Sequence, residues 1–105
     1  MITNILRFTT VFISILFCNA ASALPQVSSD KALQACIEKT AQKNNWTTLE
    51  QVTSLKCHKK KIYRVDGIKK LSHLKKLSLF NNKIEEADFT GLAKLEELNI
   101  ARNQL

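Results

Sequence analysis

The sequence has little of what most catalytic and phosphate-binding sites require. Its 105 residues include two glycines, two histidines and three cysteines. It has neither a glycine-rich phosphate loop nor a G-x-S-x-G nucleophile motif. His58 follows Cys57 directly, but no second pair of ligands stands at a metal-binding spacing from them. The chain is also short for enclosing a small-molecule substrate. The sequence therefore predicts no enzyme activity, no cofactor and no metal site.

Long apolar runs are also scarce, and the longest lies near the amino terminus. The run FTTVFISILF (residues 8–17) is uncharged but too short to span a bilayer comfortably. Small residues follow at 21–23, which is typical of a signal peptide and predicts cleavage after Ala23. The alternative is a lipoprotein signal ending at Cys18, although the large Phe17 stands where such a signal needs a small residue. The protein is therefore expected to be exported, to the periplasm, the cell surface or the medium.

Cleavage after residue 23 would leave two cysteines, Cys36 and Cys57. An even number of cysteines in an oxidising compartment favours one disulfide between them. The alternative is a pair of buried free thiols, because free cysteine is often a core residue.

Charge is unevenly distributed along the chain, whose formal net charge is +7. Residues 56–76 hold nine basic residues and one acid, whereas residues 85–97 hold five acids and one base. One interpretation of the basic segment is a solvated surface whose lysines keep a small protein soluble. The other is a binding patch for a polyanion such as lipid headgroups, acidic glycan or nucleic acid.

A repeated pattern occupies the second half of the chain. Three segments align without gaps, with starts 22 and 21 residues apart: 52–62, 74–84 and 95–105. Each is apolar at its first, fourth, sixth and eleventh positions. The ninth position is Lys60 in the first copy and asparagine in the other two, Asn82 and Asn103. This is the L-x-x-L-x-L-x-x-N-x-L pattern of a leucine-rich repeat.

Each position of the pattern has a physical role. The two apolar residues of L-x-L point from a short strand into the core. The asparagine side chain can satisfy backbone groups at the sharp turn that follows. The segments returning to the next strand supply further inward residues, namely Val65, Ile68, Leu71, Ala87, Phe89 and Leu92. Gly67 and Gly91 lie in these returns, where the chain must bend. The sequence thus predicts repeats at 52–73 and 74–94 and a truncated repeat at 95–105.

Residues 24–51 are expected to form an N-terminal segment and a helical cap. A serine or aspartate among residues 28–30 can cap a helix. Residues 31–43 have apolar residues at helical spacing, which predicts a helix. The two asparagines that follow are expected to end this helix. The stretch TTLE matches a capping box with Thr47 as its cap, and starts a second short helical turn. Trp46, between the two helices, is expected to plug the open end of the solenoid.

The run from Gly67 to Ile84, together with the repeat length and the preceding helical cap, resembles the N-terminal end of internalin-like bacterial leucine-rich-repeat proteins. The resemblance covers residues 30–105. It implies an α/β leucine-rich-repeat solenoid with short parallel strands on a concave face, and an extracytoplasmic binding role without catalysis. The chain departs from the pattern at Lys60 and stops at Leu105 within a repeat. No C-terminal cap is therefore expected, and self-association through the uncapped repeat is predicted.

Binding in a repeat protein of this kind is expected on the concave face, through the side chains that alternate with the leucines. These candidate binding residues are Lys56, His58, Lys76, Ser78, Phe80, Glu97, Asn99 and Arg102. Phe80 should be an exposed aromatic side chain, and such residues often anchor interfaces. The predicted partner is a protein or glycan. Two alternatives stay open: a basic envelope protein that binds anionic lipid or glycan through residues 56–76, and a truncated remnant without a function of its own.

Overall fold

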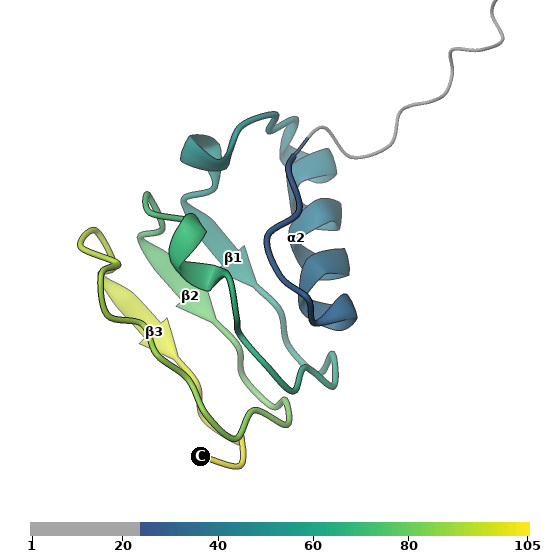
Figure 1. Cartoon of the computed structure of the whole chain (residues 1–105), viewed down its shortest axis with the longest axis vertical. Helices are drawn as coiled ribbons and strands as arrows, with labels where there is room; N and C mark the ends of the chain where they lie inside the picture. Colours follow the sequence, from purple (N-terminus) through teal and green to yellow (C-terminus); the bar gives the residue numbers. More distant parts are fainter. Residues whose placement is uncertain (1–23) are drawn as a thin grey trace, which may run out of the picture.

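The computed structural model describes residues 24–105, so the predicted signal peptide (residues 1–23), its cleavage site and Cys18 lie outside the described residues. The elements are α2 (Lys31–Asn44), η2 (Leu49–Gln51), β1 (Ser54–Lys56), η3 (Ile68–Lys70), β2 (Lys76–Ser78) and β3 (Glu97–Asn99), where η denotes a 3₁₀ helix. The strands form one parallel sheet in the order β1-β2-β3, with α2 beside β1 (Figure 1). No helix within residues 24–105 is long and apolar enough to cross a membrane. The predicted leucine-rich-repeat solenoid with a helical cap is confirmed.

The cap helix α2 begins and ends on side chains suited to those positions. The Asp30 carboxylate accepts hydrogen bonds from the backbone N–H groups of Ala32 and Leu33, at 3.0 and 3.1 Å. At the other end Asn45 adopts the left-handed conformation (φ 60°), which asparagine tolerates well. One face of the helix is buried, through Leu33, Cys36, Ile37 and Ala41. This face packs on the first repeat and closes that end of the core.

The second helical turn is displaced by one residue from the sequence prediction. η2 follows Thr48, and Gln51 Oε1 accepts hydrogen bonds from the backbone N–H groups of Thr47 (2.6 Å) and Thr48 (3.0 Å). The prediction of Thr47 as the cap, with Glu50 reaching back, was therefore wrong. Gln51 stands three residues after Thr48, the spacing from which a side chain reaches the free N–H groups of the first turn. Trp46 is half-buried and packs against the core cluster.

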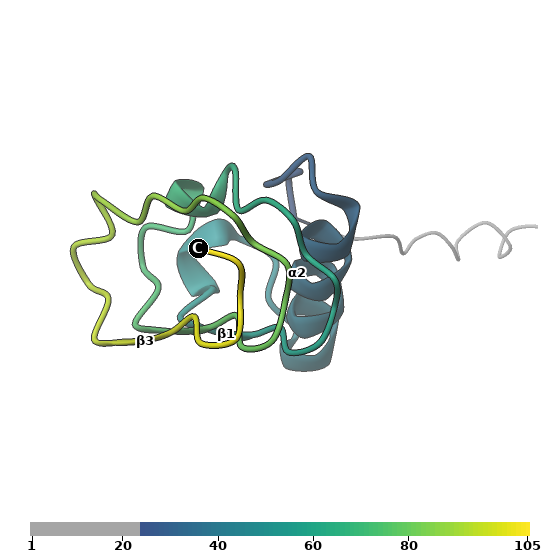
Figure 2. The same ribbon diagram turned by 90° about the horizontal axis from the view of Figure 1, so that it is seen from below.

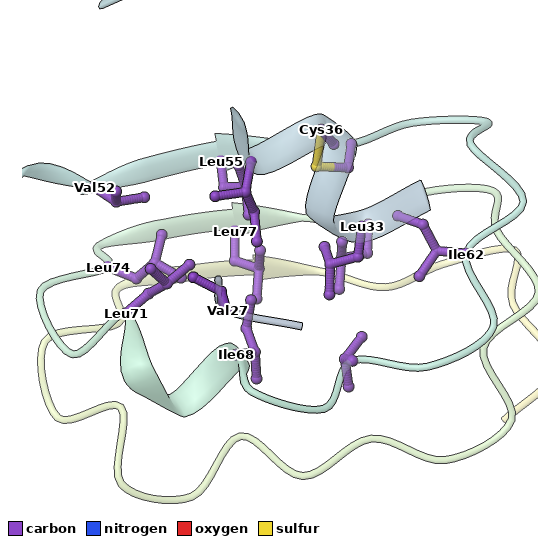
Figure 3. Close-up of a cluster of buried hydrophobic side chains, with 14 of the residues drawn as sticks. Val27, Leu33, Cys36, Val52, Leu55, Ile62, Ile68, Leu71, Leu74 and Leu77 are labelled. Atoms are coloured by element: carbon purple, nitrogen blue, oxygen red, sulfur yellow. A yellow bond between two sulfur atoms is a disulfide. The ribbon is translucent and has the colours of Figure 1, made fainter. Parts of the chain in front are cut away.

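The core is built around the repeated apolar positions, several of which converge in Figure 3 with residues of α2, the N-terminal segment and the first return. All eight such positions of the first two repeats are buried: Val52, Leu55, Cys57, Ile62, Leu74, Leu77, Leu79 and Ile84. Burying one leucine or isoleucine side chain contributes about 1.5–3 kcal/mol, so this stack supplies much of the driving force for folding. Burial decreases toward the C-terminal end of the solenoid. The equivalent residues Leu55, Leu77 and Leu98 are 1%, 2% and 43% exposed.

Each of the first two repeats forms a loop whose return segment faces its strand across the core, as the view in Figure 2 shows. The first return contains η3 and buries Val65, Ile68 and Leu71, as predicted. In the second return, Leu92 is buried, whereas Ala87 and Phe89 are only half-buried. The inward pattern of the returns is therefore confirmed, with packing that loosens toward the C-terminal end.

Residues 24–30, here called the N-terminal strap, run along the first return segment. Asp66 accepts hydrogen bonds from the Ser28 hydroxyl (3.1 Å) and from the hydroxyl and backbone N–H of Ser29 (2.6 and 3.2 Å). The Ser29 hydroxyl is the main cause of the lowered pKa of Asp66. The approach is close at Gly67, which has φ +83° and where a Cβ atom would lie 1.8 Å from the carbonyl oxygen of Val27.

Asp30 joins the same contact from the other side. Its Oδ2 accepts hydrogen bonds from the backbone N–H groups of Tyr63 (2.9 Å) and Arg64 (3.0 Å). Burial on its own would raise the pKa of Asp30, but the backbone N–H donors of Leu33, Arg64, Tyr63 and Ala32 lower it overall. One carboxylate thus caps α2 and fixes the first return segment beside it.

The asparagines of the pattern connect successive repeats. The Asn82 Nδ2 donates to the carbonyl oxygens of Cys57 and Leu79, both at 2.8 Å, and its Oδ1 accepts from the Lys60 N–H at 2.9 Å. Asn103 makes the same kinds of bond to the second repeat and to its own turn. Each asparagine therefore satisfies the backbone of the repeat before it. The first repeat follows a cap instead of a repeat, which explains why Lys60 can replace asparagine there.

The predicted disulfide between Cys36 and Cys57 is present, with a Cα–Cα distance of 6.0 Å. It links α2 to the residue that follows β1, where both side chains are buried. The alternative of two free thiols is thereby excluded for this structure.

Candidate binding face

The strand register arranges the outward side chains of the concave face in rows. Two rows follow directly from the pairing: Ser54, Lys76 and Glu97, then Lys56, Ser78 and Asn99. A third row lies just beyond the strands. There the Lys59 N–H donates to the Phe80 carbonyl (3.2 Å) and the Asn81 N–H donates to the Ala101 carbonyl (2.9 Å). These bonds keep His58, Phe80 and Ala101 side by side.

Phe80 is the centre of a cluster drawn from all three repeats, here called the Phe80 cluster (His58, Ser78, Phe80 and Arg102). The His58 ring meets the Phe80 ring edge-on, with 5.6 Å between centroids. The Arg102 guanidinium carbon lies 5.7 Å from the Phe80 centroid, a cation–π distance. His58 Nε2 and Ser78 Oγ are hydrogen-bonded at 2.6 Å. Four of the eight residues proposed from the sequence are thus in one connected group.

Phe80 is half-buried, with its ring in contact with His58 and Arg102. The prediction of an exposed aromatic at this position was therefore wrong. The reason is that the guanidinium of Arg102, a residue of the third turn with φ 59°, lies over the ring. A side chain held in this way loses less conformational entropy on binding than a free one.

The other four predicted residues surround this cluster without joining it. Lys76 and Glu97 are 3.8 Å apart in an exposed ion pair, which contributes little to stability. Asn99 uses its Oδ1 to accept a hydrogen bond from the Ala101 N–H at 3.0 Å. Lys56 is exposed and forms no ion pair with any residue of the described chain. These residues supply a polar and charged margin on the concave face.

The basic segment 56–76 is not one patch, because it covers a complete turn of the solenoid. Three of its nine cations lie beside acids: Arg64 at 3.9 Å from Asp66, Lys69 at 2.8 Å from Asp88, and Lys76 beside Glu97. Hydrogen bonds from Lys69 and Thr90 hold the pKa of Asp88 well below its usual range. These cations are close together in the sequence, but the chain runs from β1 through the return segment to β2, so they lie on different sides of the solenoid.

The turns that follow the strands repeat in the sequence as the strands do. Lys59, Asn81 and Arg102 stand at equivalent positions, 22 and 21 residues apart, and all three have positive φ (55°, 62° and 59°). Arg102 was predicted at this edge of the concave face, and the same alignment places Lys59, which was not among the predicted residues, at the equivalent position.

The opposite, convex side has a shallow open groove between the first two return segments. Its lining mixes both charges, with Arg64 and Lys69 opposite Glu85, Glu86 and Asp88. No group of three or more His, Cys, Asp or Glu side chains within residues 24–105 is arranged to hold a metal ion. The concave face is therefore the better organised of the two surfaces.

The comparisons with known proteins agree with this geometry. Residues 63–105 match a family model described as "Leucine rich repeat". The fold is similar to the crystal structure of an internalin (inlF) from Listeria monocytogenes, with a TM-score of 0.67 and 28% sequence identity. The similarity covers 83% of this chain and 28% of the internalin chain, so this chain spans just over a quarter of that protein's length. No curated protein sequence matches the chain.

Proposed function

We propose that this chain, which has a leucine-rich-repeat fold similar to that of an internalin, is an exported module that binds a protein partner through its concave face. Repeat solenoids present an extended concave surface on a rigid stack of strands, and this geometry suits macromolecular partners better than small molecules. The role proposed is recognition, without catalysis.

The observation that carries this proposal is the Phe80 cluster. An aromatic ring in contact with an imidazole and a guanidinium forms a small apolar surface among polar groups, which is the usual composition of an interface anchor. It lies on the middle repeat, with a repeat on each side. A partner that covered Phe80 would also meet Lys56, Lys76, Glu97 and Asn99.

Site-specific photocrosslinking tests the proposal. The photoreactive amino acid p-benzoylphenylalanine is placed at Lys56 on the concave face or, as the matched control, at the 56% exposed Tyr63 on the convex side. We expect a discrete crosslinked protein, identified by mass spectrometry among envelope and extracellular proteins, from Lys56 only. The Phe80→Ala change should reduce the yield of that product. It should also weaken binding of the purified partner by 1 kcal/mol or more, as truncation of an anchor does. Equal products from both positions would contradict a concave site.

A polyanion-binding function is the second candidate, supported by the net charge of +7. Binding that rests on ion contacts falls steeply between low and moderate salt, whereas docking on Phe80 should change little. Titration with heparin or anionic vesicles at two salt concentrations separates the two. If Lys69→Gln and Lys70→Gln weaken binding and Phe80→Ala does not, the polyanion function replaces the concave one.

Export is proposed from the composition of residues 1–23 and is supported by the Cys36–Cys57 disulfide, because such bonds persist in oxidising compartments. Intact-mass measurement of the protein from its natural compartment should give a chain that begins at Leu24 and has no free thiol. A chain that retains residues 1–23, or that accepts two alkyl groups without reduction, would contradict export.

Self-association through the third repeat is also proposed. Leu98 and Leu105 are 43% and 61% exposed, and β3 is the outer strand of the sheet. Exposed apolar residues beside a strand edge favour pairing with another chain. Sedimentation should show concentration-dependent dimers, and fusing a capping repeat after Leu105 should abolish them and raise the melting temperature. A monomer at all concentrations, unaffected by the added cap, would contradict this association.

A further inference from the structure

The three turns that follow the strands stack side by side at one edge of the concave face (Figure 1). The Lys59 N–H donates to the Phe80 carbonyl and the Lys83 N–H donates to the Ile62 carbonyl, at 3.2 and 2.9 Å, which fixes the first turn against the second. The bond from the Asn81 N–H to the Ala101 carbonyl (2.9 Å) fixes the second turn against the third. Residues 59–61, 81–83 and 102–104 therefore form one continuous edge.

This edge is basic and contains no acid. Five of its nine residues are cationic: Lys59, Lys60, Lys61, Lys83 and Arg102. These five residues are here called the basic edge. None of the five forms an ion pair with any residue in the described part of the chain. This contrasts with the cations of the returns and of β2, three of which have acidic partners. The unneutralised charge of the repeats is thus concentrated next to the Phe80 cluster.

Three of the five cations of the basic edge have a backbone conformation that is uncommon for their residue type. Lys59, Lys61 and Arg102 all have positive φ. This conformation is unfavourable for residues other than glycine, asparagine and aspartate. The equivalent of Lys59 in the second repeat is Asn81, a residue better suited to this conformation. Asparagine would thus fold at least as well as Lys59, so folding alone does not account for the cation there.

We propose that the basic edge and the Phe80 cluster together bind an acidic peptide segment that carries an apolar side chain. This rests on the proposed function and names the class of partner. The Phe80 ring would receive the apolar side chain, and Lys59, Lys60 and Lys61 would meet carboxylates that flank it. Lysine and arginine donors form charge-assisted hydrogen bonds with carboxylates, and these also speed the encounter of oppositely charged partners.

A peptide fits the surface better than a long polyanion. Three stacked turns extend over two interstrand spacings, roughly 10 Å, which suits a few charges and not a continuous track. Beyond this edge the cations are dispersed around the solenoid, and several are paired with acids. The aromatic ring also contributes an apolar contact that a lipid headgroup would leave unused.

Two variants of equal net charge test the proposal. The edge variant carries Lys59→Asn, Lys60→Asn and Lys61→Gln, the residues that other repeats have at these positions (Asn81, Asn82 and Gln104). The control variant carries Lys39→Gln, Lys70→Gln and Lys75→Gln, three exposed lysines away from the edge that also lack ion pairs within residues 24–105. The first probe is a fluorescein-labelled peptide of glutamate and glycine with one central phenylalanine. A second peptide has glycine in its place, and heparin is the third probe.

Anisotropy titrations at about 0.15 M salt, where the screening length is about 8 Å, measure the outcome. The edge variant should bind the phenylalanine peptide about tenfold more weakly than the parent protein, because three exposed ion contacts of modest strength are lost. The control variant should bind as the parent does. The glycine peptide should bind the parent more weakly, and Phe80→Ala should remove that difference.

Equal binding by the two variants would overturn the acidic-peptide proposal, since only overall charge would then matter. Stronger binding of heparin than of either peptide, with equal loss in both variants, would overturn it in favour of a polyanion. A concave crosslink that depends on Phe80 but not on the edge lysines would overturn this inference while leaving the proposed function intact. Circular dichroism and melting curves of both variants show that each remains folded.

Discussion

The contact between the N-terminal strap and the first return segment can be tested by adding one methyl group at Gly67. A Cβ atom there would lie 1.8 Å from the carbonyl oxygen and 2.8 Å from the carbonyl carbon of Val27. Both atoms belong to the backbone, so a side-chain rotation cannot relieve the contact. Gly91 is the matched control, because its φ of +92° is similar to the +83° of Gly67 and no atom lies within 4 Å of its Cβ position.

The two substitutions share one cost and differ in another. Placing alanine in the left-handed region costs about 1–2 kcal/mol at either position. At Gly67 the strap must also move by more than 1 Å, which would break the hydrogen bonds from Ser28 and Ser29 to Asp66. Each such bond contributes about 1 kcal/mol or less when exposed, and part of the burial of Val27 is lost as well. We therefore expect Gly67→Ala to destabilise by about 4 kcal/mol and Gly91→Ala by about 1–2 kcal/mol.

Urea unfolding followed by circular dichroism measures both free energies of unfolding. An osmolyte such as trimethylamine N-oxide brings a weakened variant into the measurable range. Hydrogen exchange adds a local test, because Gly67→Ala should remove protection from the Ser29 N–H and leave the β2 amides protected. If the two variants differ by less than about 0.5 kcal/mol, the close approach of the strap does not limit stability and the reasoning fails.

Three further predictions concern the cap, the repeats and pH. Replacing Cys36 and Cys57 together by alanine should destabilise by about 3 kcal/mol, the chain-entropy value for a sequence separation of 21. The urea unfolding curve of this variant should be the same with and without reductant. A loss of less than about 1 kcal/mol in the free energy of unfolding would contradict the value. Asn82→Ala should cost about 3 kcal/mol because it leaves buried backbone groups of two repeats without partners, and calorimetry showing no loss would exclude that role. Hydrogen bonds lower the folded-state pKa of Asp30 and Asp66, so their stabilisation is present above the unfolded pKa, about 3.9, and is lost as the pH falls below it. Asp66→Asn should flatten the decline of the melting temperature between about pH 4 and pH 2, and an unchanged slope would contradict this.

The core was predictable from the sequence because it depends only on spacing. Leucines at the fourth and sixth positions of each segment alternate on a strand, and recurrence every 21 or 22 residues requires the strands to stack. The disulfide followed for the same reason, since Cys36 lies on the buried face of α2 and Cys57 takes an inward repeat position.

What the sequence could not show are the contacts that depend on turn conformation. Arg102 lies over Phe80 from a turn whose backbone is left-handed, and the spacing of the apolar residues does not indicate where a turn directs a side chain. The shift from Thr47 to Thr48 at η2 has a similar origin, because glutamate and glutamine lie side by side at 50 and 51 and both suit a capping box. Local alternatives of nearly equal energy are decided by the packing around them.

The position of the Phe80 cluster follows from the way a solenoid gains order. A repeat is buried by its neighbours, and the second repeat has one on each side: its Leu77 and Leu79 are 2% and 0% exposed, against 43% for Leu98 in the third. Asparagine side chains also bond the second repeat to both neighbours: Asn82 Nδ2 donates to the Cys57 carbonyl, and Asn103 Nδ2 donates to the Leu79 carbonyl. A side chain anchored there has the least freedom to lose when a partner binds. The best placed anchor on the concave face is therefore in the second repeat, where the first and third repeats each contribute a cation or imidazole to hold it.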